Sequence, residues 1–512
     1  MSKNQLKNGI LLSYINMLLG SIIPFIYTPI MLRIVGQAEY GVYSMAQSVM
    51  GHLGLLNLGI GGTIVRYLAK YHAQNNLEDE QKTAGLFIKI YIVIGVLILS
   101  AGLFCASNIH IFKKTLTEDE VLKLRILIIL LSVFTAFFLP FSVFVSITIA
   151  HERFVANKLI AITATVLSPC LNLILLYRGY KSLGLVAGSA ISSLLINSCY
   201  VYYVLCKLKV HPSFKRTNNS LIREILKFSF YVFLANIVDT LFWTTDRLII
   251  GFSIGATSVA VYSIGATFNS YLTNISTTIV GVLMPRVTDM VVKDAPKEEF
   301  TKIFIKVGRI QFILVSFIIS AFISFGQIFI RIWTGEGYEA AYYVALWTMI
   351  PLSIPLIQNI GINILYALNK HKFRSLVYLF IAILNVIMTF LWVDKYGIIG
   401  AAAATCIAYI LGQGFIMNLY YNKKIGIDIP LFWKNILKMS PVMIIMGLGC
   451  WYVLRYVELI NWISFFTAAV LYTVLYFIAA YLFMMNQYEK KIFLAPLRRI
   501  YDFIHKFRIG TR

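Results

Sequence analysis

Long apolar runs separated by short polar segments dominate this chain. A membrane-spanning helix needs about 20 mostly apolar residues, and fourteen runs are long enough. They cover approximately residues 9–32, 40–65, 83–107, 125–149, 157–177, 183–206, 226–250, 257–284, 303–327, 340–367, 374–393, 397–421, 437–456 and 462–485. The polar gaps between them are shorter than about 25 residues, too short for a soluble domain. The pattern predicts an all-α, polytopic integral membrane protein with fourteen transmembrane helices.

Short sequence matches recur at nearly constant offsets, which indicates two copies of one unit. At an offset of 219, Val35-Gly36 matches Ile254-Gly255. At the same offset, Val42-Tyr43-Ser44 matches Val261-Tyr262-Ser263. Others, at offsets of 217 and 213, join 87–89 to 304–306, 171–172 to 384–385 and 184–190 to 397–403. Since each copy holds an even number of helices, both have the same orientation, as in a parallel repeat.

The repeat predicts the domain organisation. We expect an N-terminal lobe of helices 1–6 at residues 1–210 and a C-terminal lobe of helices 7–12 at residues 211–430. Residues 431–512 would add helices 13 and 14 and a basic cytoplasmic tail. Two pseudo-symmetric six-helix lobes are typical of a transporter that rocks about a central site.

Composition agrees with a membrane protein. Hydrophobic residues make up 59% of the 512 residues and charged residues 13%, against about 45–50% and 25% in soluble domains. The net charge of +23 reflects basic loops, not a nucleic-acid surface: loops on the N-terminal side hold 33 Lys and Arg, and the opposite loops hold 10. The positive-inside rule therefore places both termini in the cytoplasm. The six cysteines show no metal-ligand spacing, and we expect neither a metal site nor a cofactor.

The seventh run carries unexpected charges. Asn236, Asp239, Trp243, Asp246 and Arg247 fall on one helical face, since residues three and four apart are neighbours on a helix. A charge at bilayer depth costs at least about 2.5–3.5 kcal/mol and marks a functional position by default. We therefore predict ion-coupling or gating roles for both aspartates, which lie about 10 Å apart along the helix. The alternative for Asp246 is a structural ion pair with Arg247.

Six basic residues are candidates for a cationic, substrate-binding cavity open to the cytoplasm. They are Arg66, Lys89, Arg247, Arg286, Lys306 and Arg309. Guanidinium and ammonium groups suit phosphate, which predicts a phosphate-bearing cargo. In the alternative interpretation, the lysines and Arg309 snorkel to the interface, and Arg66 and Arg286 are ordinary positive-inside anchors. His110, His151 and His371 have the character of loop residues and show no functional pattern.

Three stretches resemble a known family. They are SYINMLLGSIIPFIYTPIMLRIVGQAEYGVYSMAQSV, LGIGGTIVRYLAKY and DRLIIGFSIGATSVAVYS. They are similar to the polysaccharide-biosynthesis export family, which includes O-antigen and capsule-unit flippases of the multidrug/oligosaccharidyl-lipid/polysaccharide exporter superfamily. Arg66 and the Asp246-Arg247 pair lie within these stretches, whereas Lys89, Lys306 and Arg309 are candidates from position alone.

The resemblance implies a transporter, not an enzyme. Its cargo would be an undecaprenyl-pyrophosphate-linked oligosaccharide, flipped across the bacterial inner membrane by alternating access with H⁺ or Na⁺ coupling. The expected partners are this lipid-linked oligosaccharide, membrane lipids and a polysaccharide polymerase complex, with a monomer as the transport unit. Two alternatives stay open: a cation-coupled multidrug antiporter of the same superfamily, and a membrane-embedded polysaccharide polymerase or ligase.

Overall fold

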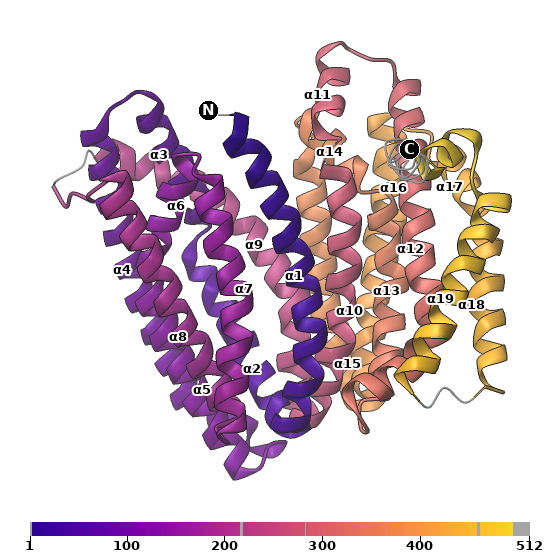
Figure 1. Ribbon diagram of the computed structural model, residues 1–512, viewed down its shortest axis with the longest axis horizontal. Coiled ribbons are helices and arrows are strands. Elements are labelled where there is room, and N and C mark those ends of the chain that lie inside the picture. Colours follow the sequence, from indigo (N-terminus) through magenta and orange to yellow (C-terminus); the bar gives the residue numbers. More distant parts are fainter. Residues whose placement is uncertain (1–2, 216–218, 282, 458–460, 495–512) are drawn as a thin grey trace, which may run out of the picture. The chain divides into compact units, whose positions relative to one another are not determined.

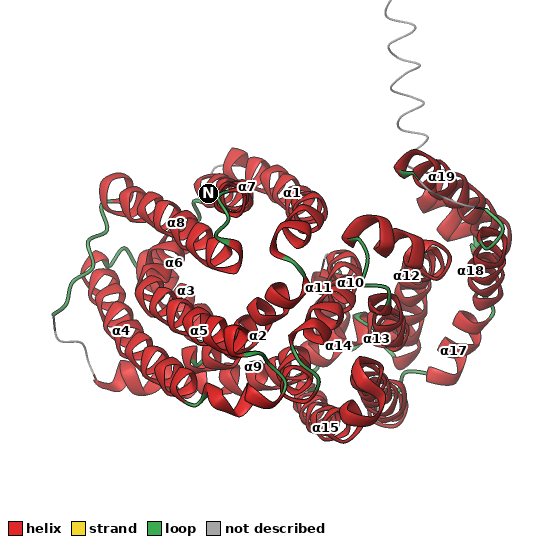
Figure 2. Cartoon of the chain, turned by 90° about the horizontal axis from the view of Figure 1, so that it is seen from below, coloured by secondary structure: helices red, strands yellow, loops and turns green. Residues whose placement is uncertain are grey.

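The computed structural model describes residues 3–215, 219–281, 283–457 and 461–494 (Figure 1). Every regular element within these ranges is helical (Figure 2), which confirms the predicted all-α fold. Ten described segments are long and apolar enough to span a membrane, or eleven if Gln37–Asn57 and Ile60–Ala73 form one bent span. The chain is thus a multi-pass membrane protein. The predicted number of fourteen is not confirmed by this count, which treats the helical segment His371–Ile425 as one span.

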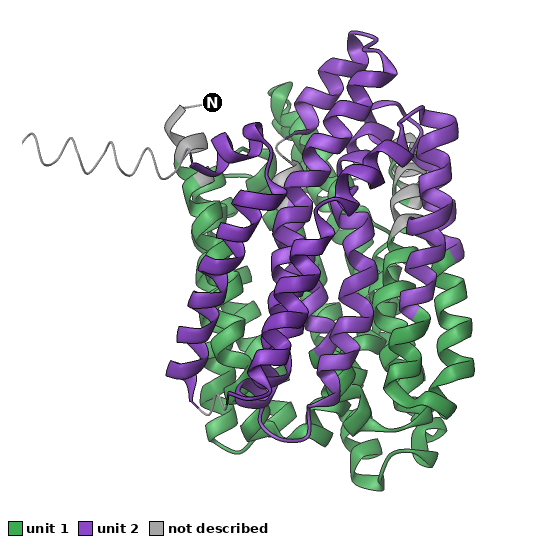
Figure 3. Ribbon diagram, turned by 90° about the vertical axis from the view of Figure 1, so that its right-hand side faces the viewer, with its two compact units in different colours: residues 1–264, 381–404 green, residues 265–380, 405–512 purple. Residues whose placement is uncertain are grey.

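Contacts divide the chain into two compact units, coloured separately in Figure 3. The first unit contains residues 1–264 and 381–404, and the second contains residues 265–380 and 405–512. Helix α9 (Asn219–Ser253) belongs to the first unit because it packs against α2 and α3 of that unit. The lobes predicted from the repeat, with a boundary near residue 210, therefore do not coincide with these contact units and stay a prediction.

The first unit is built mainly from the N-terminal helices. Its other elements are α1 (Lys3–Val35), α2 (Gln37–Leu53), η1 (Gly54–Asn57), α3 (Ile60–Ala73), α4 (Leu77–Ser107), η2 (Ile109–Lys114), α5 (Glu118–Phe138), η3 (Leu139–Phe141), α6 (Ser142–Ala150), α7 (Phe154–Tyr177), α8 (Lys181–Tyr202) and η4 (Tyr203–Leu208). It also includes the start of α10 (Ala256–Gly281) and the middle of α15 (His371–Tyr409).

The second unit contains the remainder of α10 and α15 and the C-terminal helices. These are α11 (Met284–Val292), α12 (Lys297–Thr334), α13 (Ala340–Ile357), α14 (Ile360–Ala367), η5 (Ile410–Ile416), α16 (Met417–Tyr420), η6 (Tyr421–Ile425), α17 (Ile429–Leu437), α18 (Ser440–Leu454), α19 (Trp462–Ala479) and η7 (Ala480–Met484). Within this unit α12 is central, since it packs against α13, α17, α18 and α19.

Two glycines at equivalent repeat positions make the same kind of turn. Gly36 (φ 83°) connects α1 to α2, and Gly255 (φ 105°) connects α9 to α10. Positive φ angles are strained for residues with a Cβ and easy for glycine. The repeat at an offset of 219 thus corresponds to a repeated backbone turn.

A third glycine allows α2 and α10 to approach closely. A Cβ on Gly41 would overlap the carbonyl group of Ala256 in the first turn of α10. A backbone carbonyl cannot rotate away as a flexible side chain would, so the helices would have to separate. Gly41 is therefore a packing requirement of the first unit.

We expect Gly41→Ala to destabilise the protein by about 1–3 kcal/mol, the usual cost of overpacking a core. The measurement is the thermal unfolding midpoint of the purified protein in detergent. Gly62→Ala is the matched control, because a Cβ on Gly62 in α3 meets no atom within 4 Å. Equal midpoints for Gly41→Ala and wild type would show that α2 and α10 are not in close contact.

Candidate functional site

Asp246 is the centre of a buried polar cluster in the first unit. Its side chain, on α9, is 3% exposed. The Tyr262 hydroxyl donates a hydrogen bond to Asp246 Oδ2 at 2.6 Å. On α15, Asn385 Nδ2 and Thr389 Oγ1 donate to Asp246 Oδ1 at 3.2 and 3.1 Å. We call Asp246, Tyr262, Asn385 and Thr389 the carboxylate cluster; it joins α9, α10 and the middle of α15.

The repeat places a related pair in the N-terminal copy. At the offset of 219, Tyr27 is the equivalent of Asp246, and at the offset of 213, Asn172 is the equivalent of Asn385. The side chains of Tyr27 and Asn172 are hydrogen-bonded to each other. Both copies thus hold an asparagine-based hydrogen bond at this position, but a carboxylate is present in the second copy alone. Sequence analysis missed Asn385 as a site residue, although the Leu-Asn repeat was the pattern that could have revealed it.

Arg247 follows Asp246 directly and has a different environment. It is partly buried, and its Nε is buried without a hydrogen-bond partner among the described residues. A buried polar nitrogen without a partner is costly, and more so when it is charged. Asp239, two turns earlier on α9, is exposed. The three charged residues predicted to share one helical face therefore have different surroundings. Asp246 is buried and hydrogen-bonded, Arg247 has a buried donor without a partner among the described residues, and Asp239 is exposed.

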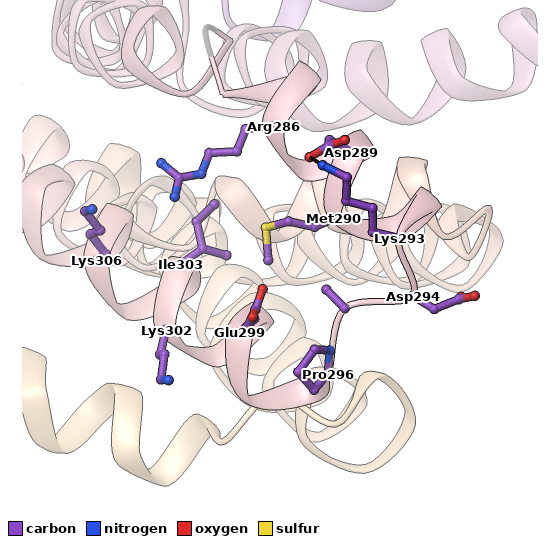
Figure 4. Close-up of a pocket in the computed structure, with 11 residues that line it drawn as sticks. Arg286, Asp289, Met290, Lys293, Asp294, Pro296, Glu299, Lys302, Ile303 and Lys306 are labelled. Atoms are coloured by element: carbon purple, nitrogen blue, oxygen red, sulfur yellow. Dashed lines mark hydrogen bonds and ion pairs between the residues drawn. The ribbon is translucent and has the colours of Figure 1, made fainter.

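A basic pocket of about 700 Å³ lies in the second unit, between α11 and the start of α12 (Figure 4). It brings together Arg286 and Lys306, which were predicted separately, and adds Lys293 and Lys302. The acidic lining residues are Asp289, Asp294 and Glu299. Since Lys293 pairs with Asp289 at 2.7 Å, Arg286 and Lys306 are the candidate anion-binding groups. In the view of Figure 4 they lie on the same side of the pocket.

The ends of two helices shape this pocket. Helix α11 carries Arg286 and ends at Val292, and Asp294 makes a positive-φ turn (φ 48°). Pro296 then caps α12 in extended conformation, where its missing N–H is not needed by the helix. Lys306 lies on α12, and its Nζ is 3.6 Å from the centroid of the Tyr488 ring, a cation–π contact.

Arg309 is held within the second unit. Its Nε and Nη2 donate to Glu489 Oε1 and Oε2 at 2.6 and 2.8 Å, and Nη2 also donates to the Met484 carbonyl at 2.8 Å. Arg309 and Glu489 are 9% and 4% exposed. This bidentate pair attaches the segment after η7 to α12. The Arg309 guanidinium is therefore engaged in a structural ion pair, not directed at a ligand.

The two remaining basic candidates lie in the first unit. Lys89 Nζ donates to the Phe214 carbonyl at 2.6 Å, so this exposed ammonium holds the segment that follows η4. Arg66 is exposed on α3. Neither is among the hydrogen-bond donors of the carboxylate cluster described above.

The helices and these sites define a class: a multi-pass, all-α membrane protein with polar and cationic groups inside its helical units. A family model described as "Polysaccharide biosynthesis protein" matches residues 6–291. The chain belongs to this family. It is also 23% identical over 395 residues to a Shigella flexneri protein named "Putative O-antigen transporter", covering 76% of this chain and 91% of that protein.

Solved structures share the fold. The inward closed conformation of the lipid II flippase MurJ superposes with a TM-score of 0.72 at 15% identity, over 96% of this chain and 99% of that one. An inward-facing multidrug resistance MATE family transporter gives a TM-score of 0.62 at 14% identity, over 83% and 99% of the two chains. At such identities the likeness concerns the fold alone.

Removing either partner of the Arg309–Glu489 pair should destabilise the second unit. Arg309→Met or Glu489→Gln leaves one buried charge without its counterpart, a loss of about 3–5 kcal/mol in soluble proteins. The double substitution should recover part of this loss, because no unpaired charge remains. Thermal unfolding midpoints in detergent measure the effect, with exposed Lys302→Met on the same helix as control. Single variants as stable as wild type would contradict the buried pair.

Proposed function

We propose that this chain is a flippase. Its cargo is an undecaprenyl-pyrophosphate-linked oligosaccharide repeat unit of O-antigen, capsule or another surface polysaccharide, moved by alternating access from the cytoplasmic to the outer leaflet of the bacterial inner membrane. Family membership, the Shigella relative and the fold shared with MurJ support this proposal. The single observation that carries it is the unused guanidinium donor of Arg247 inside a long apolar helix.

The physical need for such a protein is clear. A sugar headgroup that crosses about 30 Å of hydrocarbon loses its water, and each polar group without a hydrogen bond costs roughly 2–7 kcal/mol. A polar route through the protein removes this cost while the lipid tail stays in the bilayer. The transport unit is a monomer, since one chain contains both repeats, and membrane lipids surround it. A polysaccharide polymerase complex would receive the flipped units.

We propose two separate places for pyrophosphate contacts, one within each unit: Arg286 and Lys306 in the second unit, and Arg247 in the first. Arg286 and Lys306 line the basic pocket, where a headgroup would first bind. Within the first unit Arg247 would supply a buried donor, because its Nε is buried and unpaired among the described residues. Arginine suits this task, as its planar fork binds phosphate oxygens bidentately. Arg66 and Lys89 are secondary cationic contacts in this scheme.

The carboxylate cluster is the proposed site of ion coupling. Asp246, Tyr262, Asn385 and Thr389 bring together side-chain oxygens, the ligands that hard cations such as Na⁺ prefer; a proton on Asp246 is the other option. A cation here adds positive charge one residue from Arg247 and strengthens anion binding there. The two sites would thus be reciprocally coupled. Asp239, exposed two turns away, stays the gating candidate.

A second candidate function is a cation-coupled multidrug antiporter, which the fold shared with the MATE transporter favours. Cationic cargo requires acidic cavities, however, and the described pocket contains four basic side chains against three acidic ones. A membrane-embedded polymerase or ligase is the third interpretation, and the deletion experiment below separates all three.

The proposed flippase activity can be tested in the native host. Deleting the gene should abolish the surface polysaccharide, while lipid-linked units accumulate on the cytoplasmic face. Wild type and the exposed control Lys434→Ala should restore the polymer, and well-inserted Arg247→Ala should fail because the buried anion-binding donor is gone. Unchanged polymer with raised drug sensitivity would favour the antiporter. Single units that reach the surface but never lengthen would indicate a polymerase.

Ion binding at Asp246 can be tested by thermal unfolding of the purified protein in detergent. Raising Na⁺ at constant ionic strength and constant pH should raise the unfolding midpoint of wild type, because a ligand that binds the folded state stabilises it. Asp246→Asn should abolish the response, whereas Asp294→Asn, an exposed carboxylate, should retain it. A response that persists in Asp246→Asn, or a wild type that does not respond to Na⁺, would make Asp246 a structural carboxylate.

A further inference from the structure

A second polar cluster of the first unit has no place in the transport scheme. It combines His72 near the end of α3, Glu80 in the first turns of α4, and His151 directly after α6. His151 Nε2 lies 2.5 Å from Glu80 Oε1, and His72 Nδ1 lies 3.7 Å from Glu80 Oε2. The two imidazole rings are 3.8 Å apart between centroids. Three candidate ligand atoms thus lie within 4.8 Å of one another.

We propose that His72, Glu80 and His151 form a binding site for a divalent transition metal, with Zn²⁺ as the best match. Imidazole nitrogen and carboxylate oxygen are ordinary zinc ligands with bonds of about 2.0–2.2 Å, which places neighbouring ligand atoms of a tetrahedral site roughly 3.4 Å apart. The two separations from Glu80 oxygens to the imidazole nitrogens, 2.5 and 3.7 Å, lie on either side of that value. Small side-chain rotations would therefore complete the site.

Burial distinguishes this cluster from surface histidines. Glu80 is 2% exposed, and the His151 side chain is 9% exposed. A buried carboxylate needs compensation by positive charge or by hydrogen bonds. A metal ion would neutralise the carboxylate and would accept the nitrogen lone pairs of both imidazoles. The side chain of His72 is 44% exposed. This open side allows water to occupy the fourth position of a three-ligand zinc site.

The site would act as a clamp inside the first unit. It connects the α3–α4 turn to the turn between α6 and α7, segments about 70 residues apart. The residue after Glu80 is also an anchor: the Gln81 carbonyl accepts a hydrogen bond from the Ser213 amide at 2.9 Å, in the segment leading toward α9. A bound metal would therefore stiffen the end of the unit where this connecting segment is attached.

Metal binding by the full-length protein tests the proposal directly. The protein is purified in detergent without a histidine tag, stripped with a chelator and dialysed against Zn²⁺, and bound metal is measured per chain. We expect one Zn²⁺ per chain and a higher unfolding midpoint with metal than without it. Co²⁺ in place of Zn²⁺ should give the intense visible absorption of a tetrahedral site.

Variants separate the site from adventitious binding. His72→Ala and His151→Ala should each weaken Zn²⁺ binding by at least about tenfold, and Glu80→Gln should do the same. His110→Ala, an exposed histidine on η2, should bind as wild type does. If Glu80→Gln fails to fold, Zn²⁺ binding by His72→Ala decides the question, because His72 is exposed and its removal should leave the fold intact. Equal binding by His72→Ala and wild type, or no stoichiometric Zn²⁺ on wild type, would overturn the proposal.

Discussion

The structure of the first unit depends on how one buried carboxylate is accommodated. Asp246 lies within a long apolar helix and is almost inaccessible, where an uncompensated charge would cost several kcal/mol. Hydrogen bonds from Tyr262, Asn385 and Thr389 satisfy both of its oxygens. The donors come from α10 and α15, so the same bonds join three helices. Asn385 and Thr389 lie in the segment 381–404, which belongs to the first unit as Asp246 does.

The sequence repeat extends to this arrangement, with one chemical difference between its two halves. The turns at Gly36 and Gly255 are equivalent, and so are the hydrogen-bonding positions Tyr27–Asn172 and Asp246–Asn385. A tyrosine hydroxyl is neutral, and a carboxylate is an anion that binds cations. The difference between Tyr27 and Asp246 thus gives the second copy a chemistry that the first copy lacks.

The sequence predicted the class of fold, whereas the roles of the predicted site residues stay a prediction. Apolar runs determine helices because lipid leaves the backbone no other partners, so the all-α architecture followed directly. Arg286 and Lys306 meet in one pocket because both lie near the α11–α12 turn. The partners of Arg309 and His151 were not foreseeable: Glu489 is 180 residues away from Arg309 and Glu80 is 71 from His151. The periodicity of apolar residues predicts local elements such as helices, but it does not predict which distant residues will pair.

Neighbouring charges on one helix can have separate tasks when their surroundings differ. A direct Asp246–Arg247 ion pair would neutralise both groups and leave nothing for a ligand. Here the carboxylate is satisfied by neutral donors, and a guanidinium nitrogen is left without a partner among the described residues. Under the proposed function, the protein can therefore keep a cation site and an anion site one residue apart. Occupation of the first changes the potential at the second, so an ion gradient could drive the binding and release of a phosphate-bearing cargo.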